Sequence, residues 1–125
     1  MGKKIITSDK LPVFGPYSAA VEANGLIFIS GQIPIEPATG KIIQDIKKAA
    51  KQVLANIQTI LQEAGLKMTN IVKTTIFLRD MEDFPAVNEI YAAFFPAGPP
   101  ARSTVEVSAL PKGAPIEIEA IAIRK

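Results

Sequence analysis

The sequence predicts an α+β fold, in which one sheet of about six strands carries two helices on one face. Segments of β-branched and apolar residues alternate with segments of helical spacing, in the order strand, two strands, helix, strand, helix, two strands. The strands carry apolar side chains on both faces, whereas two helices cover only one face of a sheet. We therefore expect another subunit to cover the second face, in a homo-oligomer.

The first part of the chain is predicted to form an edge strand and a hairpin. The β-branched run Lys3 to Thr7 is typical of a short edge strand. Ala19 to Ala23 and Leu26 to Ser30 are predicted to pair, because Asn24-Gly25 between them favours a two-residue type I′ turn. Gly31 follows the second strand, where a glycine indicates a bulge or a close approach of the backbone.

The clearest helix is predicted from Asp45 to Ala64. Its apolar residues recur at intervals of three and four, which places them on one side of a helix. Asp45 is typical of an N-cap and Gly65 of the residue after a helix end. Lysines at positions 47, 48 and 51 lie on the other side, and we interpret them as a solvated face, not a binding patch.

A strand from Asn70 to Leu78 and a second helix follow. The acidic stretch Asp80 to Asp83 precedes Pro85, a combination that favours a helix start. Pro96 is predicted to end this helix.

The last quarter of the chain is interpreted as two strands joined by a turn. The strands are Ala101 to Val107 and Ile116 to Ile123, with a segment rich in proline and glycine between them. Glu117 and Glu119 share one face at the start of the last strand, and Arg102 lies on the strand expected beside it. Two carboxylates near an arginine are a candidate site, and an ion pair at a sheet edge is the alternative.

The composition limits the chemistry that this chain can perform. Its 125 residues suit one domain, residues 1–125, and it contains no cysteine and no histidine. Disulfides, zinc–thiolate sites, thiol catalysis and a Ser-His-Asp triad are therefore excluded. Acid–base chemistry must come from Asp, Glu, Lys, Tyr, backbone groups or bound water.

Charge and hydropathy set expectations about location and partners. Fourteen basic and 12 acidic residues give a net charge of +2, which provides no electrostatic argument for nucleic-acid binding. The N-terminus lacks the pattern of a signal peptide, and no apolar run approaches the ~20 residues of a membrane span. We expect a soluble cytoplasmic protein that does not bind membranes.

Five short motifs, each weak alone, occur together in this chain. They are Gly15-Pro16-Tyr17-Ser18, Ile29-Ser30-Gly31-Gln32-Ile33-Pro34, Asn88-Glu89-Ile90-Tyr91, Pro100-Ala101-Arg102-Ser103 and Ile116-Glu117-Ile118-Glu119-Ala120. With these motifs in this order, the chain resembles the reactive intermediate deaminase family of RidA type, also called the YjgF type. The resemblance covers nearly the whole chain.

The resemblance implies a fold, an assembly and an activity. The fold is chorismate-mutase-like, and the assembly is a homotrimer with ligand clefts between subunits. The activity is that of a 2-iminobutanoate/2-iminopropanoate deaminase, which hydrolyses 2-imino acids to 2-oxo acids and ammonia. These imino acids derive from 2-aminoacrylate and 2-aminocrotonate, enamines released by pyridoxal-phosphate-dependent dehydratases. No cofactor and no metal are expected.

The resemblance also implies two catalytic residues. Arg102 is the residue expected to hold the substrate carboxylate, which suits its planar fork of donors. Glu117 is expected to orient the attacking water and to handle protons. Burial in a cleft would raise the pKa of Glu117 and Arg102 would lower it, and the sequence leaves open which effect wins. An interface ion pair is the alternative role for Arg102, and Glu119 is interpreted as structural.

Five further positions are implied to bind substrate together with Arg102. Tyr17, Ser30 and Asn88 match positions that line the family's cleft, and Gly31 lets the backbone approach a ligand. Thr104 departs from the pattern, since many relatives carry cysteine there. The alternatives are loop packing for Tyr17, a strand-end cap for Ser30 and simple solvent exposure for Asn88.

Two other classes of function remain open at this point. A regulatory protein would bind small carboxylic acids in the same cleft without turning them over. An RNA-directed translation inhibitor is the other class, although the chain has no basic cluster with interleaved aromatic residues.

Overall fold

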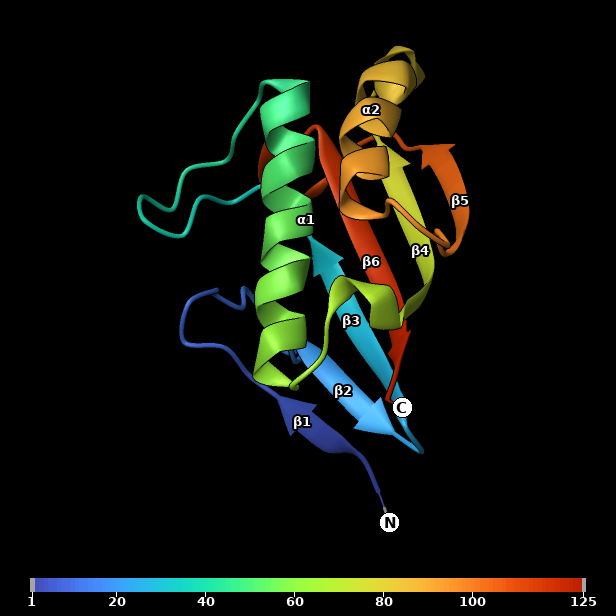
Figure 1. Ribbon diagram of the computed structural model, residues 1–125. Helices are drawn as coiled ribbons and strands as arrows, with labels where there is room; N and C mark the ends of the chain where they lie inside the picture. Colours follow the sequence, from blue (N-terminus) through green and yellow to red (C-terminus); the bar gives the residue numbers. More distant parts are fainter. Residues whose placement is uncertain (1, 125) are drawn as a thin grey trace.

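The computed structural model describes residues 2–124, which form a six-stranded sheet with two α-helices on one face (Figure 1). The strand order is β1-β2-β3-β6-β4-β5. The strands are β1 (Lys4–Ile6), β2 (Ala20–Ala23), β3 (Leu26–Gln32), β4 (Ile71–Leu78), β5 (Ala101–Glu106) and β6 (Ile116–Ile123), and the helices are α1 (Ile46–Glu63) and α2 (Phe84–Phe94). The predicted α+β class, the edge position of the first strand and both helices are confirmed.

The β2–β3 hairpin forms as predicted, around a tight turn. Asn24 and Gly25 have φ angles of 53° and 78°, the left-handed conformation that a type I′ turn requires at both positions. Strand β3 extends two residues beyond Ser30, because its register with β6 shifts between Ile29 and Gln32. This irregularity is the bulge that Gly31 indicated.

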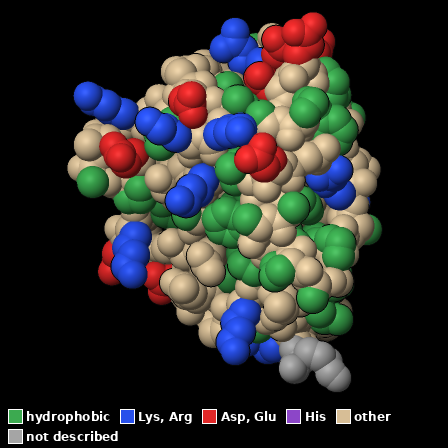
Figure 2. Space-filling view, turned by 45° about the horizontal axis from the view of Figure 1, so that its top comes forward, with side chains coloured by type: hydrophobic (Ala, Val, Ile, Leu, Met, Phe, Trp, Pro, Cys, Tyr) green, Lys and Arg blue, Asp and Glu red, His purple; other side chains and the backbone are tan. Residues whose placement is uncertain are grey.

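Helix α1 begins and ends where its capping residues predict. The Asp45 side chain accepts a hydrogen bond from the Lys48 backbone N–H at 3.1 Å, and Gly65 has a φ of 75° just after the helix. The lysine face is exposed, and Lys47 Nζ lies 3.1 Å from Glu89 Oε1 of α2. Figure 2 shows basic and acidic side chains interspersed on the surface.

The prediction that the last two strands pair as neighbours is wrong. Strand β4 lies between them, pairing parallel with β5 on one side and antiparallel with β6 on the other. The physical reason is that β4, α2 and β5 form a strand–helix–strand unit, whose crossover connection makes its two strands parallel. Strand β6 then enters the centre of the sheet between β3 and β4, and within one chain only one of its two faces is buried.

The two faces of the sheet differ in their exposure. The face beneath the helices forms the core, where Ile116, Ile118 and Ala122 of β6 are fully buried. The other face, here called the open face, carries large apolar side chains: Phe28, Val105 and Ile123 are 44%, 42% and 39% exposed. Within residues 2–124, no helix has the length and apolar character needed to cross a membrane.

Candidate active site

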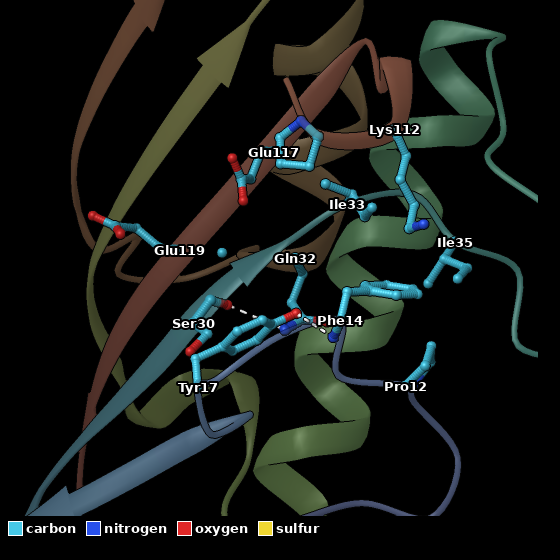
Figure 3. Close-up of a pocket in the computed structure, with 12 residues that line it drawn as sticks. Pro12, Phe14, Tyr17, Ser30, Gln32, Ile33, Ile35, Lys112, Glu117 and Glu119 are labelled. Carbon is cyan, nitrogen blue, oxygen red and sulfur yellow. Dashed lines mark hydrogen bonds between the residues drawn. The ribbon is translucent and has the colours of Figure 1, made fainter. Parts of the chain in front are cut away.

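Six of the seven sequence-predicted site residues line two separate hollows, and Thr104 lines neither of them. A hollow of about 510 Å³ is lined by Tyr17, Ser30, Gly31 and Glu117, here called the glutamate half (Figure 3). A second hollow of about 500 Å³ is lined by residues that include Asn88 and Arg102, here called the arginine half.

The two halves lie on opposite faces of the sheet. Arg102 is in register with Thr74 of β4, which is buried beneath the helices. Glu117 is in register with Phe77, three residues further along the same strand and therefore on the open face. The expectation that Arg102 neighbours the two glutamates is wrong within one chain, because β4 separates their strands.

Gly31 makes room for the Glu117 carboxylate. A methyl group at position 31 would overlap that carboxylate and lie 2.8 Å from its Cδ. The bulge in β3 brings the Gly31 backbone against the glutamate, which requires a residue without a Cβ. We had expected Gly31 to admit a ligand, and the structure shows that it admits the glutamate side chain.

The surroundings of Glu117 favour its protonated form. Partial burial raises the pKa of Glu117, and the negative charge of Glu119 raises it further. Figure 3 shows Glu119 and Glu117 on the same side of the hollow. Because Arg102 of the same chain is on the other face, the question that the sequence left open is answered within one chain in favour of a raised pKa.

Tyr17 and Ser30 both hold the turn that precedes β2. The Tyr17 hydroxyl accepts a hydrogen bond from the Phe14 backbone N–H at 3.1 Å, and the Ser30 hydroxyl donates one to the Ser18 carbonyl at 2.6 Å. These contacts agree with the packing and capping alternatives. Both side chains also line the hollow, and 44% of Tyr17 is exposed.

The arginine half presents a guanidinium group that is already oriented. Arg102 Nη1 donates a hydrogen bond to Asn88 Oδ1 at 2.8 Å, so Asn88 does more than face solvent. The guanidinium carbon lies 5.1 Å from the centroid of the Phe84 ring and 4.9 Å from that of Tyr91. Tyr91 is fixed in turn by a 2.6 Å hydrogen bond with Thr74. These contacts limit the rotamers of Arg102 while leaving the residue exposed.

Thr104 lies two residues after Arg102 on β5, so the two side chains are on the same face of the strand. It is in register with Ile76 on the helix-covered side, and its hydroxyl oxygen is buried. Among residues 2–124, this oxygen has no hydrogen-bond partner. A hydroxyl that is buried without a hydrogen-bond partner is unusual in folded proteins.

Sequence reasoning missed the residues that orient the predicted ones. Tyr91 was interpreted only as part of the apolar face of the second helix, and neither Phe84 nor Asn56 of α1 was considered. The available signal for Asn56 was a polar residue three positions after Val53, on the apolar side of the helix. It is 1% exposed, and its amide donates to the carbonyls of Ile33 and Ile35 beside the hollow.

The two halves supply complementary chemistry. A carboxylate with a raised pKa is a stronger base than an ordinary glutamate and can accept and return a proton, and an oriented guanidinium can bind a carboxylate bidentately. Within residues 2–124, no group of three or more acidic side chains is arranged to hold a metal ion.

Comparison with known proteins places the chain in a family. The model of the Endoribonuclease L-PSP family matches residues 7–124, and the chain belongs to this family. It is 47% identical to the 2-iminobutanoate/2-iminopropanoate deaminase of Salmonella typhimurium, and 48% identical to the protein of the same name from Escherichia coli K12. Each match covers 100% of both chains.

Solved structures show the same fold. The YjgF gene product of E. coli matches with a TM-score of 0.93 and 48% identity, over 98% of this chain and 99% of that one. E. coli TdcF, solved with bound serine, matches with a TM-score of 0.93 and 43% identity over the same shares. The YjgF-type family predicted from the five motifs is confirmed.

Proposed function

We propose that this protein is a 2-iminobutanoate/2-iminopropanoate deaminase, an enzyme that hydrolyses 2-imino acids to 2-oxo acids and ammonia. The observation that carries the proposal is the pairing of a half-buried glutamate of raised pKa with a preset guanidinium group. The names of relatives at 47% and 48% identity support it.

The proposed enzyme is a homotrimer in which neighbouring subunits complete each site. One chain holds the glutamate and arginine halves on opposite faces, so a complete site requires a second copy. The exposed apolar side chains of the open face support this assembly, because water disfavours such surface. In a trimer, the arginine half of one subunit faces the glutamate half of the next.

The proposed mechanism needs only these groups and a water molecule. Arg102 binds the substrate carboxylate, and Glu117 accepts a proton as water adds to C2 and the C=N electrons move to nitrogen. Glu117 returns this proton to the nitrogen of the resulting carbinolamine. Glu117 then takes the hydroxyl proton as C=O forms and passes it to the departing nitrogen, which keeps the electron pair of the breaking C2–N bond, so that ammonia and the 2-oxo acid are released. The chemistry requires neither a metal nor a cofactor.

Five further residues line the proposed cleft. Tyr17 and Ser30 offer hydroxyl groups, and Gly31 places Glu117. Asn88 orients Arg102, and the Thr104 hydroxyl, which is buried without a partner among residues 2–124, lies on the same face of β5 as Arg102. We propose that Thr104 serves in place of the cysteine of many relatives, without a thiol in the mechanism.

The proposed substrates arise where dehydratases release enamines. 2-Aminoacrylate and 2-aminocrotonate tautomerise to 2-iminopropanoate and 2-iminobutanoate, and the protein would act on both in the cytoplasm. These imines also hydrolyse without an enzyme, so the enzyme only raises the rate of hydrolysis.

A coupled assay tests the proposal. A pyridoxal-phosphate-dependent dehydratase generates the imine in the presence of semicarbazide, which traps it, and the protein is expected to divert the imine to free 2-oxo acid. Glu117→Gln is the control for contaminating activity. If the ratio of semicarbazide adduct to free 2-oxo acid is the same with and without the protein, the deaminase proposal is contradicted.

The regulatory alternative has one observation in its favour, since TdcF was solved with bound serine, a small carboxylic acid. Calorimetry with pyruvate or serine separates the two, because binding without accelerated hydrolysis identifies a binding protein. The description of the family as an endoribonuclease keeps RNA as a control ligand, for which steeply salt-dependent binding would be the signature.

A further inference from the structure

The hollow of the glutamate half extends beyond the proposed catalytic groups into an apolar arm. The arm is formed by Pro12, Phe14, Ile33 and Ile35, with Lys112 at its outer end. Figure 3 shows these side chains on one side of the hollow, and Glu117, Glu119, Ser30 and Tyr17 on the other. One continuous hollow therefore has a polar end and an apolar end.

The hollow is larger than the proposed substrates need. Its volume is about 510 Å³, which falls in the range of sites for drug-sized ligands. 2-Iminobutanoate has seven non-hydrogen atoms, which at about 30 Å³ for each water-sized group fill roughly 200 Å³. The whole hollow therefore has more than twice the volume of such a molecule, which leaves room for a longer one.

One wall of the arm is held rigidly. Ile33 and Ile35 are 6% and 5% exposed, and their backbone carbonyls accept hydrogen bonds from the Asn56 amide at 3.3 and 3.1 Å. Asn56 Oδ1 accepts in turn from Gln52 Nε2 at 2.8 Å. Helix α1 thus fixes the position of this wall.

The opposite wall is an aromatic ring with unused apolar surface. Phe14 is 47% exposed, and its backbone N–H donates to the Tyr17 hydroxyl. The Lys112 ammonium group lies 4.5 Å from the centroid of the ring, so one region of the ring is covered by a cation. The remaining ring surface and the isoleucines offer a slot between apolar walls, from which a hydrocarbon chain displaces water favourably.

We propose that the apolar arm is a subsite for the substrate side chain, which extends the substrates of the protein from 2-iminopropanoate and 2-iminobutanoate to 2-imino acids with apolar side chains of three or four carbons. The proposal rests on the proposed function and specifies its substrate class. The reacting carbon lies at the Glu117 end, and the side chain extends towards Phe14. Each methylene that enters the arm is expected to raise kcat/KM roughly four-fold.

The test compares imines of increasing length. An amino-acid oxidase generates the imines of alanine, 2-aminobutyrate and norleucine with semicarbazide as the competing trap, and kcat/KM is measured for each. The norleucine imine is expected to exceed the 2-aminobutyrate imine by about 10-fold. Equal values, or a steady fall with length, would overturn the subsite.

Variants of the exposed wall locate the effect. Phe14→Ala is expected to lower kcat/KM for the norleucine imine about 10-fold more than for the alanine imine, mainly through KM. Phe14→Leu keeps an apolar wall and retains most of the preference. Val13→Ala, an exposed neighbour that does not line the hollow, is the matched control. An equal loss on all imines in Phe14→Ala would show that the ring only supports the turn.

Binding of stable 2-oxo acids separates this inference from the proposed function. If no imine is hydrolysed, the deaminase proposal fails, yet calorimetry still tests the arm: 2-oxohexanoate, which has three more methylenes, should bind roughly 60-fold tighter than pyruvate, with most of the difference lost in Phe14→Ala. Tighter binding of 2-oxoglutarate than of 2-oxohexanoate would overturn the inference, because Lys112 would then select an acidic side chain.

Discussion

Two effects shift the pKa of Glu117 in the same direction. Burial is the larger cause and the charge of Glu119 the smaller, and both raise the pKa of Glu117. Gly31 lies directly against this carboxylate, so the residue is both destabilised as an anion and confined. Raised pKa values combined with confinement are common at sites of proton transfer.

Replacement of Glu117 is expected to separate activity from stability. Glu117→Gln should lower imine hydrolysis roughly 10²-fold or more, the usual effect of losing a positioned acid–base group. Glu119→Gln is the matched control and should lower it much less. A larger loss in Glu119→Gln would show that the wrong carboxylate was assigned.

The same variant is expected to change the dependence of stability on pH. The folded state holds the Glu117 proton above the ordinary pKa of 4.5, so wild-type stability falls as pH rises from there through the raised value. In the separated subunit, where no second arginine half faces the carboxylate, Glu117→Gln should therefore unfold at higher denaturant concentration than wild type at pH 7, and the two should converge below pH 4.5. A variant less stable than wild type at pH 7 would contradict the destabilised carboxylate.

Arg102→Lys tests whether the guanidinium fork matters beyond its charge. Lysine keeps the positive charge but loses the bidentate geometry, and kcat/KM for 2-iminopropanoate is expected to fall about 10- to 100-fold. Assembly and melting temperature should change little. Kinetics close to wild type would reduce Arg102 to an interface charge.

Among the elements, helix α1 has a role that its length and caps do not reveal. It packs on the sheet through its apolar side, and through Asn56 it also anchors the segment that follows β3. The segment has few strand contacts of its own, apart from a single bridge between Ile35 and Ile42. Two backbone hydrogen bonds, from Ile43 N–H to the Pro34 carbonyl and from Glu36 N–H to the Lys41 carbonyl, hold the segment together with the buried Asn56 amide.

Asn56→Ala is expected to destabilise the protein by about 1–3 kcal/mol, because the carbonyls of Ile33 and Ile35 lose their donor in a buried place. Gln58→Ala, at an exposed position of the same helix, is the matched control and should have little effect. Urea denaturation measures both. Equal stability of the two variants would mean that water replaces the amide without cost.

For the whole molecule, the open face and the divided site lead to the same expectation. Phe28, Val105 and Ile123 leave apolar surface exposed on a sheet that the helices cover on one side only. The arginine half and the glutamate half are complete only if two copies meet. Assembly and activity should therefore be lost together.

We expect a stable homotrimer at micromolar concentration, measured by sedimentation equilibrium. Phe28→Lys should weaken it, because a charge replaces apolar area on the open face. Val72→Lys is the comparison variant, because Val72 is also an apolar strand residue and is 44% exposed, the same as Phe28. A monomeric wild type with full activity would rule out a site shared between subunits.

The sequence by itself determined the elements and the family. Local signals are sufficient for these, because Asn24-Gly25 sets a turn, Asp45 and Gly65 set helix ends, and apolar spacing separates strands from helices. Five motifs in order identified the family. Of the predicted site residues, the structure places Tyr17, Ser30, Gly31 and Glu117 together, and Asn88 with Arg102.

Only the tertiary structure decided how the strands are ordered and what surrounds each site residue. The neighbours of a strand depend on long-range pairing, and adjacency in sequence wrongly suggested that β5 pairs with β6. The separation of Arg102 from Glu117, the close contact of Gly31 with the carboxylate and the anchoring by Asn56 all follow from that order. These contacts join residues far apart in the chain, which local patterns of polarity and turn chemistry do not encode.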